Sequence, residues 1–116
     1  MTIKPKYETP KTTPAESKAA YSGVALRSFG MCEICGKARA TEKHHRLYRS
    51  HGTLDIVENL LDVCGWGNHT GCHGRAHNDP ERYANGWAVR SGFDPALKPV
   101  LYRGRLMILT ADGGLA

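Results

Sequence analysis

Residues 63–77 read VCGWGNHTGCHGRAH, and this stretch carries two of the four cysteines and three of the six histidines of the chain. Cys72 is followed directly by His73, and His77 comes four residues later. Cysteine thiolates and histidine imidazoles are the side chains that bind zinc and related metals. The stretch therefore predicts metal binding, and its two residue types predict two separate sites.

Length and charge limit what surrounds these sites. A chain of 116 residues is expected to form one domain with a modest core, which a structural metal would stabilise. The net charge of +5 favours an anionic partner such as DNA. Five cations cluster around a histidine doublet, although a solvated basic surface would show the same pattern: Lys37, Arg39, Lys43, Arg46 and Arg49.

The chain shows no sign of membrane insertion. The first residues, MTIKPKYETPKTTP, contain no apolar segment of the kind found in signal peptides. No apolar run approaches the roughly 20 residues of a membrane helix. We therefore expect a soluble cytoplasmic protein without a membrane partner, in which cysteines bind metal rather than form disulfides.

Turn and capping signals predict a small α+β fold. Residues 1–12 are expected to be a flexible basic arm, and residues 13–116 a single domain. Thr13, Pro14 and Glu16 predict a capped helix over 14–27 that ends near Gly30 and packs through an apolar face. The contacts expected from that face are Tyr21, Val24 and Leu26.

The rest of the chain predicts two short strands, a second helix and a hairpin. Residues 40–50 are expected to be extended, and the aliphatic residues of 57–63 predict a second strand. A helix of about two turns is expected to begin at Cys72. Residues 100–102 and 106–109 predict a C-terminal β-hairpin around Arg103 and Gly104.

The cysteines form two pairs, Cys32 with Cys35 and Cys64 with Cys72. The first pair has the spacing of a zinc knuckle. The second has a gap of seven residues, longer than the usual spacing of about two to four, but three glycines in it let the chain fold back. We expect four thiolates around one structural Zn²⁺. Four independent thiols, or three cysteines with His69, are the alternatives.

Two histidine pairs are interleaved with these cysteines. His73 and His77 are spaced i,i+4, which places both imidazoles on one face of a helix. Such a pair alone also fits two exposed histidines. A preceding doublet, His44 and His45, followed by Asn59 and then by this pair, is a much rarer order.

This order resembles the HNH endonuclease family, whose active site is a ββα-metal motif. The matching segments are EKHHRL (42–47), VENLLDVC (57–64) and CHGRAH (72–77), and the cysteines are similar to those of the zinc-bound branch. The resemblance covers about residues 31–78. Residues 77–95 and the late ADGG also resemble small phage-encoded HNH proteins of actinobacterial viruses.

The resemblance implies a metal-dependent DNA endonuclease and assigns roles to the histidines. His44, His73 and His77 would hold a divalent ion, His45 would be the general base, and Asn59 would hold His45 in place. Many family members have an aspartate where this chain has His44, so the site should accept Mn²⁺, Ni²⁺ or Zn²⁺ besides Mg²⁺. Neighbouring residues of a flat strand face opposite ways, so we expect the first strand to end or twist at the doublet.

The resemblance also implies a phage-encoded protein that acts with terminase subunits in genome packaging, in the host cytoplasm. Lys43, Arg46 and Arg49 are candidate contacts to DNA phosphates beside the scissile bond. A zinc-ribbon module that binds nucleic acid without cutting it would explain the cysteines but not the order of the histidines. A homing or restriction nuclease would need DNA-reading elements, for which the chain has little room.

Overall fold

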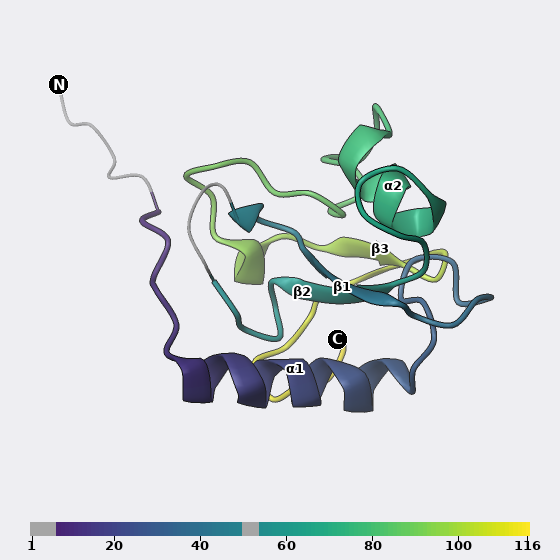
Figure 1. Ribbon diagram of the computed structural model, residues 1–116. Coiled ribbons are helices and arrows are strands. Elements are labelled where there is room, and N and C mark those ends of the chain that lie inside the picture. The colour runs from purple at the N-terminus through teal and green to yellow at the C-terminus, as the bar shows by residue number, and fades with distance from the viewer. Residues whose placement is uncertain (1–6, 50–53) are drawn as a thin grey trace, which may run out of the picture.

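The computed structural model describes residues 7–49 and 54–116, and Figure 1 shows their arrangement. Along the chain the elements are α1 (Pro14–Ser28), β1 (Glu42–His45), β2 (Leu60–Val63), α2 (Gly71–Asn78), the 3₁₀ helix η2 (Pro95–Leu97), β3 (Val100–Tyr102) and β4 (Arg105–Met107). β1 pairs antiparallel with β2, and β3 with β4. This confirms a small α+β fold with an N-terminal helix and a C-terminal hairpin.

The β1–β2 pair lies between the two helices, with α1 along one side and α2 on the other (Figure 1). All four residues of β2 are buried for this reason. On one side Leu60 packs against Ala20 and Val24 of α1. On the other side Leu61 and Val63 belong to the main core. Its other buried members come from the knuckle (residues 31–37), from α2, from the segment after α2, from β3 and from the segment after β4: Cys32, Ile34, Cys72, Ala76, Trp87, Val100, Tyr102 and Leu109.

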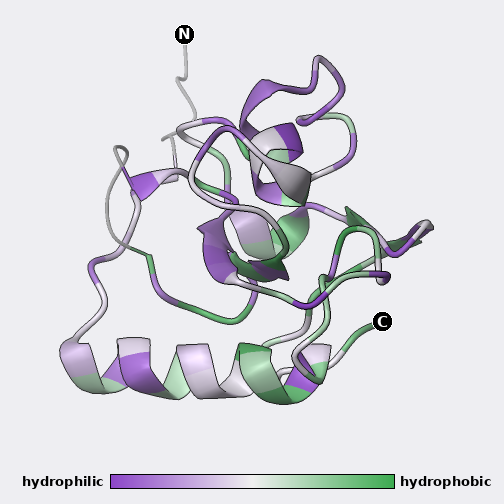
Figure 2. Cartoon of the chain, turned by 45° about the vertical axis from the view of Figure 1, so that its right-hand side comes forward, coloured by the Kyte–Doolittle hydropathy of each residue, from purple (hydrophilic) through white to green (hydrophobic). Residues whose placement is uncertain are grey.

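The start of α1 agrees with the prediction, but its inner face does not. Thr13 and Glu16 form both hydrogen bonds of a capping box. Hydrophilic and hydrophobic residues alternate along the helix without a continuous apolar stripe (Figure 2). Val24 is buried as predicted, whereas Tyr21 is 37% exposed and Leu26 is 77% exposed. The predicted packing roles of Tyr21 and Leu26 were therefore wrong.

Gly23 explains how α1 comes so close to the chain before β2. A Cβ atom at this position would lie 2.9 Å from Cγ1 of Val57, closer than atoms normally pack. A side chain at this position would push α1 away from the sheet, which explains why a glycine is present although glycine is a poor helix former. α1 ends at Phe29, whose left-handed backbone turns the chain towards the knuckle.

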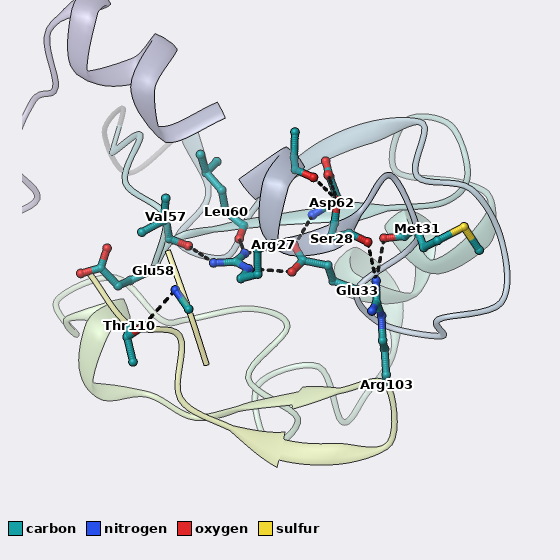
Figure 3. Close-up of polar contacts among 12 residues, drawn as sticks. Arg27, Ser28, Met31, Glu33, Val57, Glu58, Leu60, Asp62, Arg103 and Thr110 are labelled. Atoms are coloured by element: carbon teal, nitrogen blue, oxygen red, sulfur yellow. Dashed lines mark hydrogen bonds and ion pairs between the residues drawn. The ribbon is translucent and has the colours of Figure 1, made fainter. Parts of the chain in front are cut away.

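A charged residue takes the inner position that Leu26 was expected to fill. The guanidinium of Arg27 forms two bonds to the carboxylate of Glu33, at 2.6 and 3.0 Å, and both side chains are almost fully buried (Figure 3). Arg27 also donates to the carbonyl of Leu60, and Glu33 accepts from the amide of Asp62. Breaking a buried pair of this kind costs about 3–5 kcal/mol, so this pair fixes α1 and the knuckle to β2.

The second strand is shorter than predicted. Residues 57–59 form a turn, and the strand begins at Leu60. The C-terminal hairpin turns at Arg103 and Gly104 as expected, but its second strand begins one residue earlier and ends two residues earlier than predicted.

Residues 1–6, half of the predicted flexible arm, lie outside the described residues. In the other half, the ring of Tyr7 packs against Leu47, Leu54 and Val89, and its amide donates to the carbonyl of Gly92. No helix in the described part of the chain has the length and apolar character needed to cross a membrane.

Candidate metal centres and the histidine pocket

The four cysteines meet at one point of the fold. The sulfurs of Cys32, Cys35, Cys64 and Cys72 all lie within 4.8 Å of one another. Two of them are buried and two are partly exposed. Four sulfurs this close form the donor set of a closed structural zinc site. His69 is exposed on the preceding loop and is not part of the cluster.

Two glycines make the long cysteine gap close. Gly65 and Gly71 both have positive φ, at 96° and 58°. Their backbones touch, since a Cβ at Gly71 would lie 2.6 Å from Cα of Gly65. Only residues without a side chain allow this approach, which brings Cys64 and Cys72 together at the start of α2.

The surroundings of the sulfurs change how readily Cys35 and Cys72 ionise. Burial, and then the charge of Cys32, raises the pKa of Cys72 far above that of a free thiol. Burial also opposes ionisation of Cys35, yet hydrogen bonds from the amides of Lys37 and Ala38 lower its pKa to about 7. Four thiolates at this distance would repel one another without a positive charge between them. A Zn²⁺ ion supplies that charge, so the donor set fits the metal.

Three histidines form a second cluster between β1 and α2. The ring centroids of His44, His73 and His77 are 5.1–5.2 Å apart, and one nitrogen from each lies within 4.8 Å of the others. His44 comes from β1, and the other two lie one turn apart on α2. The i,i+4 spacing therefore places both imidazoles opposite the strand, as the sequence predicts.

Hydrogen bonds fix which nitrogen of two of the rings, those of His44 and His73, faces the centre. Nε2 of His44 donates to the carbonyl of Trp87 at 2.6 Å, because a carbonyl can only accept. Nδ1 of His44 is buried and has no hydrogen-bond partner among the described residues. Nδ1 of His73 donates to the carboxylate of Glu42 at 2.7 Å, which leaves its Nε2 free. Carboxylates and carbonyls orient metal-binding histidines in this way.

Burial favours the neutral form of His44 and of His77. It lowers the pKa of His44 to about 3, and the neighbouring rings of His77 and His73 add to the effect. Burial and His73 also lower the pKa of His77. Neutral imidazoles with free lone pairs are ligands for a divalent cation. The buried, unpartnered Nδ1 of His44 shows that the cluster fits one.

His45 lies at the last position of β1 and has a carboxylate partner that the sequence did not indicate. Its Nε2 donates to Oδ1 of Asp55 at 2.6 Å, and both residues are 7% exposed. Burial lowers the pKa of His45, and Asp55 opposes this effect. The bond holds one tautomer of His45, with the proton on Nε2 and the lone pair on Nδ1.

Asn59 ties together the two ends of the segment between β1 and β2. Its side-chain carbonyl accepts from the amide of Leu47 at 2.7 Å, and its amide group donates to the carbonyl of Leu54 at 2.8 Å. Asn59 is fully buried. It therefore fixes the chain just after His45 and just before Asp55, so both members of that pair are held by one amide.

A cavity of about 450 Å³ opens over the histidines. Its lining includes His45, His73 and His77, so the carboxylate-paired histidine and the two α2 histidines of the cluster face one space, while His44 lies buried behind them. Lys43 and the exposed Arg49 also line it. The ammonium of Lys43 lies 2.7 Å from the carboxylate of Asp62, so Arg49 carries the less compensated charge.

Arg46 does not line this cavity, and its predicted contact to DNA was wrong. The side chain is fully buried. Its guanidinium donates five hydrogen bonds, all to backbone carbonyls, of Glu58, Gly86, Pro95, Lys98 and Pro99. No donor remains for a phosphate. Arg46 instead binds the segment 86–99 to the end of β1.

Three orienting groups were missed by sequence reasoning. Glu42 has the same parity as His44 along β1, so strand alternation could have placed it near the cluster. Asp55 lies outside both strands, and no periodicity connects it with His45. Trp87 contributes a main-chain carbonyl, for which no side-chain signal exists. The ring of Tyr48 stacks on His77 at 4.7 Å, and its hydroxyl donates to the carbonyl of Ala76.

Comparisons of the chain with family models, with curated proteins and with solved structures found no significant match.

Proposed function

We propose that the chain is a metal-dependent endonuclease that hydrolyses phosphodiester bonds of DNA, with a ββα-metal core of the HNH type and a structural zinc. The order of β1, β2 and α2 around the histidines supports this core. The observation that carries the proposal is the shared cavity: a histidine paired with a carboxylate faces the same space as His73 and His77, whose ring nitrogens lie within 4.8 Å of one on the buried His44.

The roles of the residues follow from their hydrogen bonds. His44, His73 and His77 would hold a divalent cation, which would neutralise the scissile phosphate and stabilise the departing oxygen. The Nδ1 lone pair of His45 accepts a proton from the attacking water. Asp55 keeps the other proton on Nε2 and stabilises the imidazolium that forms.

The basic residues at the cavity hold the substrate. Arg49 is exposed there and binds a phosphate next to the scissile bond, while Lys43, which is paired with Asp62, adds a weaker contact. Asn59 makes no contact with DNA in this mechanism and acts by fixing the chain on both sides of the reaction centre.

The test is nicking of a supercoiled plasmid with Mg²⁺, Mn²⁺, Ni²⁺ or Zn²⁺ added separately. We expect His45→Ala to lose activity with every ion, while its zinc content and melting temperature stay those of the wild type. His69→Ala is the matched control, because His69 is an exposed histidine close to the same helix. Wild-type protein that nicks with none of the four ions, or a His45→Ala protein that nicks normally, contradicts the proposal.

The non-catalytic zinc module remains the alternative, supported by the cysteine cluster and the basic charge. It predicts that wild type and His45→Ala bind DNA equally and that neither cuts. Element analysis also distinguishes the two functions. A protein that binds one zinc per chain and no second divalent ion favours the non-catalytic module. Phage origin, terminase subunits as partners and a role in genome packaging remain predictions of the resemblance, as does the homing or restriction alternative.

A further inference from the structure

A second cavity, of about 340 Å³, lies away from the histidines. Its walls come from residues 83–90 and 93–99, and the apolar part of its lining includes Ala88, Val89 and Pro99. None of its lining residues belongs to the three-histidine cluster or to the His45–Asp55 pair. A cavity of this size is at the lower end of small-ligand sites, which span about 300–1,000 Å³.

The two charged residues that line this cavity are both positive. Arg90 and Lys98 line it and are exposed. Within the described part of the chain, no carboxylate forms an ion pair with either one. No acidic residue is part of the lining. The cavity is therefore a place where an anion would be attracted and bound.

The buried Arg46 adds to this potential from below. Its guanidinium bonds to the carbonyls of Lys98 and Pro99, which form one wall of the cavity. All its partners are neutral carbonyls, and burial lowers its pKa only to about 10, so it stays charged at neutral pH. A full positive charge therefore lies behind this wall, and because Arg46 is fully buried, water screens its charge poorly.

Aromatic rings lie next to the cations. The guanidinium of Arg90 is 4.0 Å from the ring centroid of Tyr83, and the ammonium of Lys98 is 4.6 Å from that of Phe93. Phe93 is 48% exposed. Proteins often bind single-stranded nucleic acid through cations next to exposed aromatic rings. The cations bind the phosphates, and the bases stack on the rings or on guanidinium planes.

A short bridge of side chains connects the two cavities. Tyr48 lines the histidine pocket and Tyr83 lines the second cavity. Arg82 lies between them: its guanidinium is 4.6 Å from the ring centroid of Tyr83 and lies against the side chain of Tyr48. A nucleic-acid strand that leaves the histidine pocket would therefore meet further cations and rings before it reaches the second cavity.

We propose that the second cavity binds one nucleotide of single-stranded nucleic acid, on a strand that continues from the histidine pocket. Binding needs no cleavage, and the inference rests on the proposed function only in that the bound strand is the one cut at the histidines. The N-terminal residues of the chain, MTIKPK, contain two cations and no acid. Because cations line the cavity, this positively charged segment of the same chain is not a suitable occupant for it.

The test measures binding of a fluorescent single-stranded oligothymidylate about 10 nucleotides long. The binding protein is His45→Ala loaded with zinc, so that cleavage does not interfere. We expect the added pair Arg90→Gln and Lys98→Gln to weaken binding at least about tenfold at low salt. The dependence of log K on log salt should become less steep by about 1.4, or 0.7 for each lost phosphate contact.

The matched control removes two exposed cations elsewhere, Lys18 on α1 and Arg105 on β4, again as glutamines. It changes the net charge equally and should weaken binding less than about threefold, the effect of long-range charge alone. Phe93→Leu should weaken binding about fivefold or more without changing the salt dependence, because it removes a stacking surface and no charge.

Three results would overturn the inference. One is that the Arg90→Gln, Lys98→Gln double variant binds the oligonucleotide as tightly as the control double variant does. Another is the absence of chemical-shift changes at the amides of Ala84 and Val89 when the oligonucleotide is added. The third is tighter binding of oligoglutamate of equal charge, which would make the cavity a site for an acidic peptide. Plasmid nicking by wild type tests the proposed function separately, so either idea can fail while the other holds.

Discussion

Replacing Asp55 with alanine removes the group that fixes the tautomer of His45. The bond between them is short, at 2.6 Å, and both residues are 93% shielded from solvent. A hydrogen bond to a charged group contributes about 1.5–3 kcal/mol. If that energy holds the lone pair of His45 towards the cavity, its loss reduces kcat about 10- to 150-fold, at 1.36 kcal/mol for each factor of ten.

Two measurements separate this effect from unfolding. Single-turnover nicking gives the rate of the chemical step, and we expect it to fall while the apparent affinity for DNA stays the same. Nitrogen chemical shifts of the His45 ring report its tautomer without any activity. We expect a single Nε2-protonated form in wild type and a mixture in Asp55→Ala.

The control is Asp112→Ala, which removes an exposed carboxylate that accepts only local bonds. It should leave both measurements unchanged. The reasoning about Asp55 is refuted if Asp55→Ala is folded, keeps the wild-type rate and shows the same His45 tautomer.

Three further predictions concern the metal sites. Cys35→Ser should lose bound zinc and unfold the domain at room temperature, measured by element analysis and circular dichroism; a zinc-free protein with wild-type melting would contradict the structural role. Gly65→Ala should reduce zinc affinity in a chelator competition, because its Cβ would lie 2.0 Å from the carbonyl oxygen of Thr70. Glu42→Gln should weaken binding of the second divalent ion about 10- to 100-fold by calorimetry while zinc content stays at one, since it alters the partner that orients His73. Unchanged affinity for that ion would exclude an orienting role of the carboxylate.

The parts of the fold that the sequence predicted well depend on local chemistry. The capping box placed the start of α1 at Pro14, and the i,i+4 spacing placed two imidazoles on one face of α2. The glycines between Cys64 and Cys72 predicted a loop that closes, and the sulfurs do meet. Each of these signals is complete within about ten residues, so tertiary packing had little to change.

The errors occurred where long-range packing decides which side chain turns inward. Composition made Leu26 a core residue and Arg46 a surface residue, and the structure has both the other way round. Strand parity offered a partial warning for Arg46, since it shares the parity of the buried His44. The carbonyls that satisfy its guanidinium come from residues up to 53 positions away, and nothing near Arg46 in the sequence announces them.

The same lack of local signal hid Asp55. Its contact with His45 depends on the path of the chain between β1 and β2, and Asn59 sets that path by bonding to both ends of the segment. A sequence shows that an asparagine is present, but the two backbone groups it joins are known only from the fold. Positioning residues of this kind are therefore harder to predict than ligands, whose residue type already limits their chemistry.

The two predicted metal sites contain residues that are neighbours in the chain, so metal binding at one site is expected to depend on the other. Cys72 and His73 are neighbours, and the amide of His73 donates to the carbonyl of Cys64 at 2.9 Å. The first turn of α2 is thus held by the cysteine loop, and the same turn carries an imidazole of the histidine cluster. If zinc is removed, the start of α2 loses its attachment, and the free nitrogens of His73 and His77 no longer converge with that of His44. Affinity for the second ion must then fall together with zinc occupancy, whereas loss of the second ion leaves the cysteine loop intact.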